Sequence, residues 1–177
     1  MISFIIPAHN SEKFLKRCVE SVVKEEKQPK DNNLAEVIII ENGSSDHTKQ
    51  IGTALAEKYE NVFLICSEKG VSNARNAGVK AAHGEWIFFL DADDYLPAGT
   101  LQKLLDTVNS GKAADLYIFS YEKGNAIVNV ATGENADGYE GTGVRESLAG
   151  MLRNPTRCMA VWGKLFRHSI IQQSSLD

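Results

Sequence analysis

Five short apolar segments alternate with helical patterns along residues 2–120, and this alternation constrains the fold more than any other feature of the chain. The segments cover residues 2–6, 37–40, 62–66, 86–90 and 116–120. Residues 86–90 are apolar without interruption, which is typical of a strand covered on both faces in a parallel sheet. Strand–helix alternation forms right-handed βαβ units. We therefore expect an α/β fold, an open and mostly parallel sheet with helices on both faces.

Apolar residues at helical spacing mark the segments between these strands. Helices are predicted after a cap at Asn10 or Ser11, with Phe14 on the apolar face, after the turn at 42–45, over 72–82 and over 100–110. The helix over 72–82 is rich in Ala and Gly, so it can lie close to the sheet. Beyond residue 120, glycines punctuate a polar stretch. There we expect a hairpin near 126–130, a short helix over 145–153 and a last segment over 160–166.

Composition limits the classes of function. The 177 residues carry a formal net charge of −4, which argues against a nucleic-acid-binding surface. An anionic ligand is compatible with this charge, because a bound cation can invert the sign of a site. Cys18, Cys66 and Cys158 are too widely spaced for a disulfide framework or a zinc site. We therefore expect buried thiols in a reducing, cytoplasmic compartment.

Targeting signals are not predicted. The apolar start of the chain has no basic residues before it and is too short for a signal peptide. No stretch of the sequence approaches the roughly 20 apolar residues that span a bilayer. His47, His83 and His168 have no partners at metal-ligand spacing, and we expect them at the surface.

Two aspartates follow the strand over residues 86–90. In an extended chain, residues two apart point to the same side, so Asp91 and Asp93 should project together. Ligands of open α/β sheets bind beyond the carboxyl ends of the strands, where the strand order reverses. That crevice would lie between the first and fourth strands and would gather residues 7–9, Glu41 and the two aspartates.

Paired carboxylates beside an apolar strand repel one another and are costly to desolvate. A hard cation such as Mg²⁺ or Mn²⁺ would compensate, because it prefers oxygen ligands and shares them with phosphates. The plainer alternative is that the aspartates cap the turn before Pro97. Asp94 should point the other way and fits this alternative.

Four segments in register carry a resemblance to a known family. They are residues 5–10 (IIPAHN), 40–46 (IENGSSD), 74–78 (ARNAG) and 89–94 (FLDADD). In this order and at this spacing the chain resembles a family 2 glycosyltransferase of the GT-A fold. A weaker match over residues 161–166 is similar to a segment of members that build bacterial surface polysaccharides. The resemblance implies a donor-binding half over residues 1–120 and part of the acceptor side over 121–177, within one domain.

The resemblance also implies a role for each matching residue. Pro7-Ala8-His9 would border the nucleotide base, although the family commonly has Tyr at the position of His9. Glu41 stands where the family usually has Asp and would accept a hydrogen bond from the uracil N–H. Arg75 would lie near the nucleotide phosphates, and Glu12 at the pocket rim. The plainer interpretations are a turn residue for Glu41, a solvated side chain for Arg75 and a first-turn carboxylate for Glu12.

Within Asp91-Ala92-Asp93, the resemblance implies that Asp91 reaches the ribose or the waters of the metal. Asp93 would ligate the Mn²⁺ or Mg²⁺ that bridges the diphosphate. Trp162 and Lys164 would face an acceptor sugar, or would form a packed aromatic with a lysine stem along it.

The implied reaction transfers a sugar from a nucleotide diphosphate, of the UDP type, to an acceptor hydroxyl with inversion. Acceptors in the family are saccharides, often lipid-linked, so peripheral attachment at the inner face of the membrane is compatible with the sequence. The family's general base is usually part of an acidic pair, and no acids after Asp94 are adjacent. We therefore expect the base to lie beyond Asp177, in a chain truncated at its C-terminus that binds donor but transfers sugar poorly.

Two other functions stay open at this point. The chain could hold a sugar nucleotide or a partner protein without turnover. It could also be an unrelated Mg²⁺-dependent α/β enzyme, but phosphoryl-transfer enzymes of that kind place a nucleophilic Asp at the end of the first strand. This chain has Pro7-Ala8-His9 there. The dinucleotide and P-loop signatures are absent.

Overall fold

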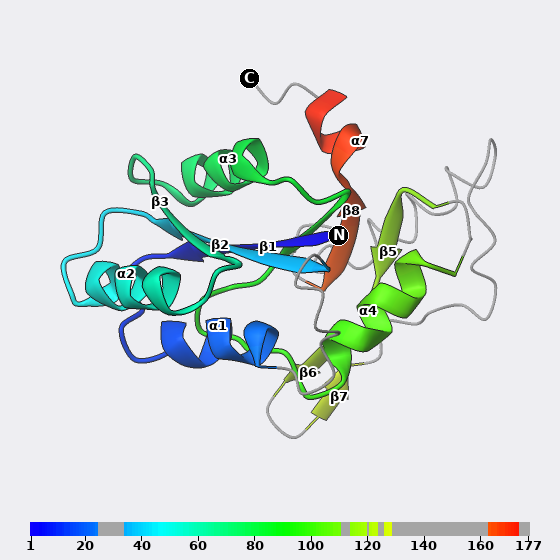
Figure 1. The fold of residues 1–177 in the computed structure, drawn as a ribbon, viewed down its shortest axis with the longest axis horizontal. Helices are drawn as coiled ribbons and strands as arrows, with labels where there is room; N and C mark the ends of the chain where they lie inside the picture. Colours follow the sequence, from blue (N-terminus) through cyan, green and yellow to red (C-terminus); the bar gives the residue numbers. More distant parts are fainter. Residues whose placement is uncertain (25–33, 111–113, 120, 124–125, 129–162, 174–177) are drawn as a thin grey trace.

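The computed structural model describes residues 1–24, 34–110, 114–119, 121–123, 126–128 and 163–173. Their centre is a six-stranded sheet in the order β3-β2-β1-β4-β8-β5 (Figure 1). Its strands are β1 Ile2–Ala8, β2 Ala35–Glu41, β3 Val62–Cys66, β4 Trp86–Phe89, β5 Leu116–Ile118 and β8 Lys164–Arg167. β1 to β4 are parallel, and β8 runs antiparallel to both β4 and β5. The prediction of an open, mostly parallel sheet is confirmed.

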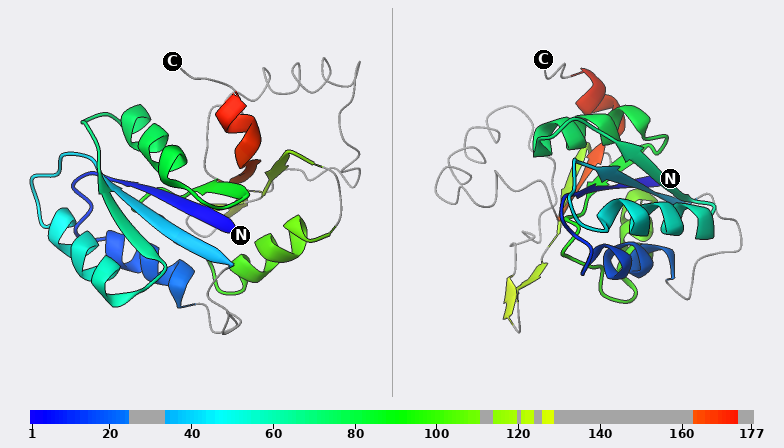
Figure 2. Two further views of the ribbon diagram at one scale, coloured as in Figure 1. Left: turned by 45° about the horizontal axis from the view of Figure 1, so that its top comes forward. Right: turned by 90° about the vertical axis from the view of Figure 1, so that its left-hand side faces the viewer.

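Helices cover both faces of this sheet, as predicted (Figures 1 and 2). On one face lie α1 Leu15–Val23, α2 Thr48–Lys58 and α4 Thr100–Val108, and on the other lie α3 Val71–Ala81 and α7 His168–Gln173. Side chains of β1 alternate between the two sides, because successive strand residues point to opposite faces. Phe4 and Ile6 pack with α1 and α4, whereas Ile5 packs with α3.

The close approach of α3 to the sheet depends on its small residues. A Cβ added at Gly78 would lie 2.3 Å from Cγ2 of Ile5. Ala74, one turn earlier, is fully buried in the same contact. The small-residue pattern over 72–82 therefore brings this helix, and Arg75 with it, close against β1.

β1 continues through Pro7 to Ala8, so the prediction that it stops before Pro7 is wrong. Pairing with β4 ends at Ile5, whose carbonyl accepts from Leu90 N–H (3.0 Å). Pro7 has the orientation of Ile5, so its missing N–H would face the side where β4 has already ended. On the other side Ala8 stays paired with β2, and its carbonyl accepts from Asn42 N–H (3.0 Å).

The start of α1 also differs from the prediction. Regular helix begins at Leu15, and residues 12–14 form a turn whose first acceptor is the carbonyl of Ser11. Phe14 precedes the helix and is 43% exposed, instead of packing on its apolar face. All three cysteines were predicted to be buried, and two of them lie in the described residues. Cys18 is buried as predicted, but Cys66 is exposed at the end of the edge strand β3.

The C-terminal part contributes elements that the sequence did not predict. Residues 164–167 form β8 inside the sheet, and Lys164 is buried there. His168 begins α7 and is buried rather than exposed, with its ring nitrogens at 2.9 Å from the carbonyl of Gly84 and 3.1 Å from that of Val79. The predicted hairpin is present as β6 Tyr121–Lys123 and β7 Ala126–Val128. The predicted helix over 145–153, Cys158 and Trp162 lie outside the described residues.

A polar cluster closes the amino ends of the central strands. Glu36 on β2 accepts hydrogen bonds from the Ser3 hydroxyl (2.6 Å), His83 N–H (2.7 Å) and Gly84 N–H (3.2 Å). The His83 ring nitrogen lies 3.2 Å from the other carboxylate oxygen. Burial alone would raise the pKa of Glu36, but these donors outweigh it and hold the pKa below its ordinary value.

Across the part of the chain that the structure describes, we find no helix that combines the length and the apolar character needed to traverse a bilayer.

Candidate functional site

A cavity of about 510 Å³ opens at the carboxyl ends of β1 and β4. The strand order reverses between these two strands, because β2 and β3 lie beyond β1 on the other side. Pro7-Ala8-His9 and Asp91-Ala92-Asp93 line the cavity, as the sequence predicted for this edge. Pro7, Ala8 and Ala92 give it an apolar lining, and the two aspartates add negative charge.

The aspartates reach the cavity from a turn, not from an extended strand. β4 ends at Phe89, and Asp94 N–H donates to the carbonyl of Asp91 (3.0 Å). The alternation argument for Asp91 and Asp93 is therefore wrong in its geometry, although both residues line the same cavity. Asp94 is exposed and is not among the lining residues, in agreement with the prediction for it.

Side chains of helix α1 hold the backbone of this turn and of the residues that follow it. Arg17 Nη2 donates to the carbonyl of Asp93 (3.0 Å), and its guanidinium stacks 4.7 Å from the ring centre of Tyr95. The Cys18 thiol donates to the carbonyl of Asp91 (3.5 Å). Leu96 N–H donates to Ser21 Oγ (2.9 Å). The carboxylates are thus left for the cavity while the main chain of the turn is fixed.

Arg75 is the cation nearest to these carboxylates among the ion pairs of the described residues. Its Nη2 lies 3.5 Å from Asp91 Oδ1, with 28% and 35% of the two side chains exposed. Burial raises the pKa of Asp91, the guanidinium of Arg75 opposes this, and the charge of Asp93 adds to it, so that the pKa lies above its ordinary value. Burial, followed by the charges of Asp94, Asp91 and Asp93, also raises the pKa of the Cys18 thiol. Negative charge at this edge is therefore only partly compensated by the protein.

The donor set fits a hard cation that is shared with a ligand. Among the described residues, no three His, Cys, Asp or Glu side chains are arranged to hold a metal by themselves. Mg²⁺ and similar ions usually take one or two carboxylates and complete their shell with water and substrate phosphates. Asp91 and Asp93 face an open cavity, and the pKa of Asp91 is raised. This arrangement matches a cation shared with a ligand and not an all-protein cage.

The loops after β1 and β2 are locked together by hydrogen bonds between side chains and backbone N–H groups. Asn10, which has a positive φ of 50°, accepts through Oδ1 from Ser45 N–H (2.9 Å). Ser11 N–H donates to Thr48 Oγ1 (2.7 Å), and Glu12 N–H donates to Asp46 (3.1 Å). Ser45 and Thr48 therefore hold Asn10 and Ser11, which line the cavity, and Asn42 lines it directly.

Three of the predicted site residues, Glu12, Glu41 and Arg75, do not line the cavity, although Arg75 contacts Asp91. Glu12 accepts from His47 N–H (3.1 Å), which with the His47 ring lowers its pKa. Glu41 is buried and accepts from Ser44 N–H (2.5 Å). Burial works against the charge of Glu41, but hydrogen bonds from Ser44 and Gly43 outweigh it and lower its pKa. Both carboxylates are engaged by the loop after β2.

His9 stays at the cavity, with its ring oriented by the Asn42 carbonyl, to which Nδ1–H donates (2.9 Å). The same asparagine accepts through Oδ1 from Gly70 N–H (2.8 Å), which ties the start of α3 to this loop. The cavity also has lining residues that were not predicted for the site: Asn10, Ser11, Phe14, Asn42, Lys69, Gly70 and Val71. Lys69-Gly70 directly precedes the ARNAG helix, and a cation before a glycine-capped helix start could have signalled an anion site.

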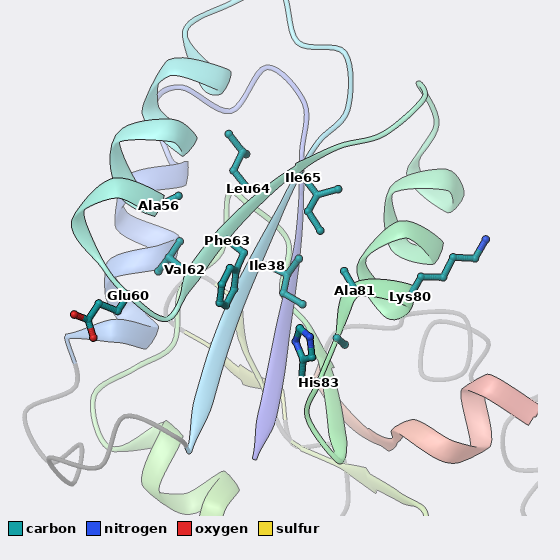
Figure 3. A pocket seen from close by; sticks show the side chains of 11 residues that line it. Ile38, Ala56, Glu60, Val62, Phe63, Leu64, Ile65, Lys80, Ala81 and His83 are labelled. Atoms are coloured by element: carbon teal, nitrogen blue, oxygen red, sulfur yellow. The ribbon is translucent and has the colours of Figure 1, made fainter.

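A second and larger cavity, of about 650 Å³, lies beside the edge strand β3 and the end of α3 (Figure 3). Its lining is mostly apolar and includes Ile38, Phe63 and Ala81, with Lys80 and His83 at its margin. None of the predicted site residues lines this cavity. The smaller cavity, where charged and apolar groups converge, is therefore the candidate functional site.

Comparison with known proteins identifies the family of the chain. The family model described as "Glycosyl transferase family 2" matches residues 3–173. The EpsH protein of Bacillus subtilis is 29% identical over 99% of this chain, and the chain covers 49% of EpsH. The chain thus spans about half the length of this curated relative.

Solved structures share the fold. S. aureus TarS 1–349 superposes with a TM-score of 0.75 at 24% identity, over 99% of this chain and 49% of that one. The same TarS fragment has been crystallised with UDP-GlcNAc. The mannosyltransferase PcManGT of Pyrobaculum calidifontis, in complex with GDP-Man and Mn²⁺, gives a TM-score of 0.64 at 17% identity, over 98% of this chain and 46% of that one.

Proposed function

The chain belongs to glycosyl transferase family 2 and has the GT-A fold, and we propose that it binds a uridine-type sugar nucleotide at the cavity between β1 and β4. The observation that carries this proposal is the convergence of Asp91, Asp93 and Lys69 on one cavity at the reversal of strand order. Complexes of TarS with UDP and UDP-GlcNAc support the nucleotide class.

Residues 1–120 form the donor-binding half in this proposal, and residues 121–177 belong to the acceptor side of the same domain. The uracil ring lies against Pro7-Ala8-His9. Glu41 becomes its hydrogen-bond partner once the Glu41 carboxylate turns away from Ser44 N–H. The diphosphate lies between the aspartates and the start of α3, where Lys69 and the helix N-terminus supply positive potential and Arg75 adds its charge from beside Asp91. Glu12 supports the rim through His47.

Asp93 and Asp91 would hold Mn²⁺ or Mg²⁺ together with the diphosphate oxygens. Bound there, the ion supplies Lewis-acid stabilisation of the leaving diphosphate. The Mn²⁺ complex of PcManGT supports this cofactor class. The protein's own contribution is to keep the Asp91–Asp94 turn in place through Arg17, Cys18 and Ser21.

The proposed reaction is transfer with inversion. An acceptor hydroxyl oxygen bonds to the anomeric carbon, the bond from that carbon to the diphosphate oxygen breaks, and its electron pair leaves with the nucleotide. The hydroxyl proton passes to a carboxylate that acts as general base. Asp91 and Asp93 are the only carboxylates among the described residues that line the cavity. A separate base therefore stays a prediction.

The acceptor in this proposal is a saccharide, free or lipid-linked. The poly(ribitol-phosphate) β-glucosyltransferase of Bacillus spizizenii, 36% identical over 56% of this chain, supports a polymer acceptor. A lipid-linked acceptor would bring the chain to the cytoplasmic face of a membrane by peripheral contact.

Calorimetry tests the donor site. The wild-type chain should bind UDP with Mn²⁺, and Asp93→Ala should weaken that binding at least about 100-fold, a loss of about 2.7 kcal/mol. The matched control is Asp94→Ala, which removes the same charge from the same turn outside the cavity lining. Control and wild type should bind alike. Equal affinity of Asp93→Ala and Asp94→Ala would rule out the site.

Turnover separates catalysis from binding alone. Family membership argues against an unrelated Mg²⁺-dependent enzyme. Donor binding without sugar transfer to any saccharide acceptor would favour a binding module.

A further inference from the structure

The ion pair between Arg75 and Asp91 leaves hydrogen-bonding groups of both side chains without a close partner. Their closest approach is 3.5 Å, longer than the 2.7–2.9 Å of a strong charge-assisted hydrogen bond. Arg75 Nε is buried and has no hydrogen-bond partner in the part of the chain that the structure describes. A guanidinium normally fills its donors in a fixed fork, so this arrangement does not satisfy it.

Arg75 is not itself a lining residue of the cavity, but from α3 it reaches Asp91, which is one. Ala74 and Gly78 press this helix against β1, so Arg75 cannot move away with its backbone. Its long side chain can turn. It now reaches Asp91, and because helical side chains lean toward the N-terminus of their helix, the start of α3 is the other direction open to it, where Gly70 and Val71 line the cavity.

A divalent cation and a guanidinium cannot both occupy Asp91 at low cost, because two positive charges would share one carboxylate. A diphosphate, in contrast, offers a guanidinium paired oxygen acceptors. A bound donor would thus remove the reason for Arg75 to stay on Asp91 and provide a better partner.

We propose that Arg75 is an exchangeable counter-ion: it occupies Asp91 while the site is empty and moves to the donor diphosphate when the site fills. This inference rests on the proposed function and adds a role to it. Arg75 then opposes cation binding when nucleotide is absent and favours nucleotide binding when the cation is present. The cation and the donor therefore bind better together than singly, which limits capture of the free ion.

The test uses Mn²⁺ alone, followed by the loss of the free-ion signal in electron paramagnetic resonance. Arg75→Gln should bind Mn²⁺ about threefold to tenfold more tightly than wild type. With saturating Mn²⁺, the same variant should bind UDP at least about tenfold more weakly. Arg75→Lys, which keeps the charge and loses the fork, should match wild type for Mn²⁺ alone and be intermediate for UDP.

Two controls separate exchange from a general loss of positive charge. Lys80→Gln removes a charge from an exposed position of the same helix and should leave both affinities unchanged. Lys69→Gln removes a charge from the cavity lining and should tighten Mn²⁺ binding less than Arg75→Gln does. Equal tightening by the Lys69 and Arg75 variants would overturn the exchange, as would unchanged or weaker Mn²⁺ binding by Arg75→Gln. Failure of wild type to bind UDP with Mn²⁺ would instead reject the proposed function and the donor half of the exchange, and the Mn²⁺-only comparison would still decide whether Arg75 competes with the cation for Asp91.

Discussion

Both ends of the central strands carry partly or wholly buried carboxylates, but the two ends provide these carboxylates with very different hydrogen-bond and charge partners. At the amino end, the Glu36 side chain is 7% exposed and accepts hydrogen bonds from Ser3, His83 and Gly84. At the carboxyl end, Asp91 is 35% exposed and has one cationic partner at 3.5 Å. The pKa of Glu36 is lowered and that of Asp91 is raised.

The difference separates a structural acid from a binding acid. A buried carboxylate whose lone pairs are filled by fixed donors contributes to stability, because its donors would be left unpaired without it. A carboxylate that lacks hydrogen-bond donors lowers the stability of the fold, and it becomes stabilised when a cation or a ligand binds to it. This contrast favours the cavity at the carboxyl end as the candidate functional site, although the cavity beside β3 is larger.

Removing the structural acid should have the larger effect on folding. Glu36→Gln should lower the free energy of unfolding by about 2 kcal/mol, because at least one buried donor loses its charged acceptor. Since the pKa of Glu36 is lowered by folding, its contribution is present above the unfolded pKa and disappears as pH falls through the folded pKa. Urea unfolding at neutral and acidic pH measures both effects.

The control for this variant is Glu57→Gln on the exposed side of α2, which should change stability by less than about 0.5 kcal/mol. Binding of UDP with Mn²⁺ should survive in Glu36→Gln. A stable Glu36→Gln protein that has lost donor binding would reverse the roles assigned to the two ends.

Removing the binding acid should have a smaller effect on folding, of opposite sign. Asp91→Asn should raise the free energy of unfolding at neutral pH by at most about 0.5 kcal/mol, since the partly exposed side chain is screened by solvent. The raised pKa means that folding favours the protonated form, so stability falls as pH rises through the interval between the unfolded and folded pKa. The gain should therefore vanish in acid, below the unfolded pKa.

Differential scanning calorimetry without added metal measures this gain, and calorimetric titration of the same variant should show weakened binding of UDP with Mn²⁺. A clear loss of stability in Asp91→Asn at neutral pH would make Asp91 a structural residue like Glu36 and would remove the contrast.

Much of the fold could be predicted because several strands and one helix have distinctive local sequence patterns. The apolar residues 86–90, the β-branched residues 37–40 and the small-residue helix over 72–82 each specify one local structure, and the structure confirms all three elements. Pro7 was misjudged because its effect depends on the length of the neighbouring strand, which is not a local property. β8 and His168 were missed because four residues late in the chain pair with strands about 50 and 80 residues earlier.

The site was predicted as a set of residues and only partly as a geometry. Asp91, Asp93 and Pro7-Ala8-His9 line one cavity because parallel strands end at one edge. The turn at 91–94 depends on Arg17, Cys18 and Ser21 from another helix, so strand alternation could not describe it. Glu12 and Glu41 were expected at the ligand, but their hydrogen bonds to the loop after β2 are long-range or turn-specific contacts without a pattern in the sequence.

The central claim is that the carboxylates at 91 and 93 are left unsatisfied for a cation that arrives with a nucleotide. Anomalous diffraction at the manganese edge, from crystals grown with UDP and Mn²⁺, tests it most directly. We predict one strong peak at coordination distance from Asp93 and from the diphosphate, with Arg75 turned away from Asp91. A nucleotide bound elsewhere, or no peak while both carboxylates face bulk solvent, would contradict the account.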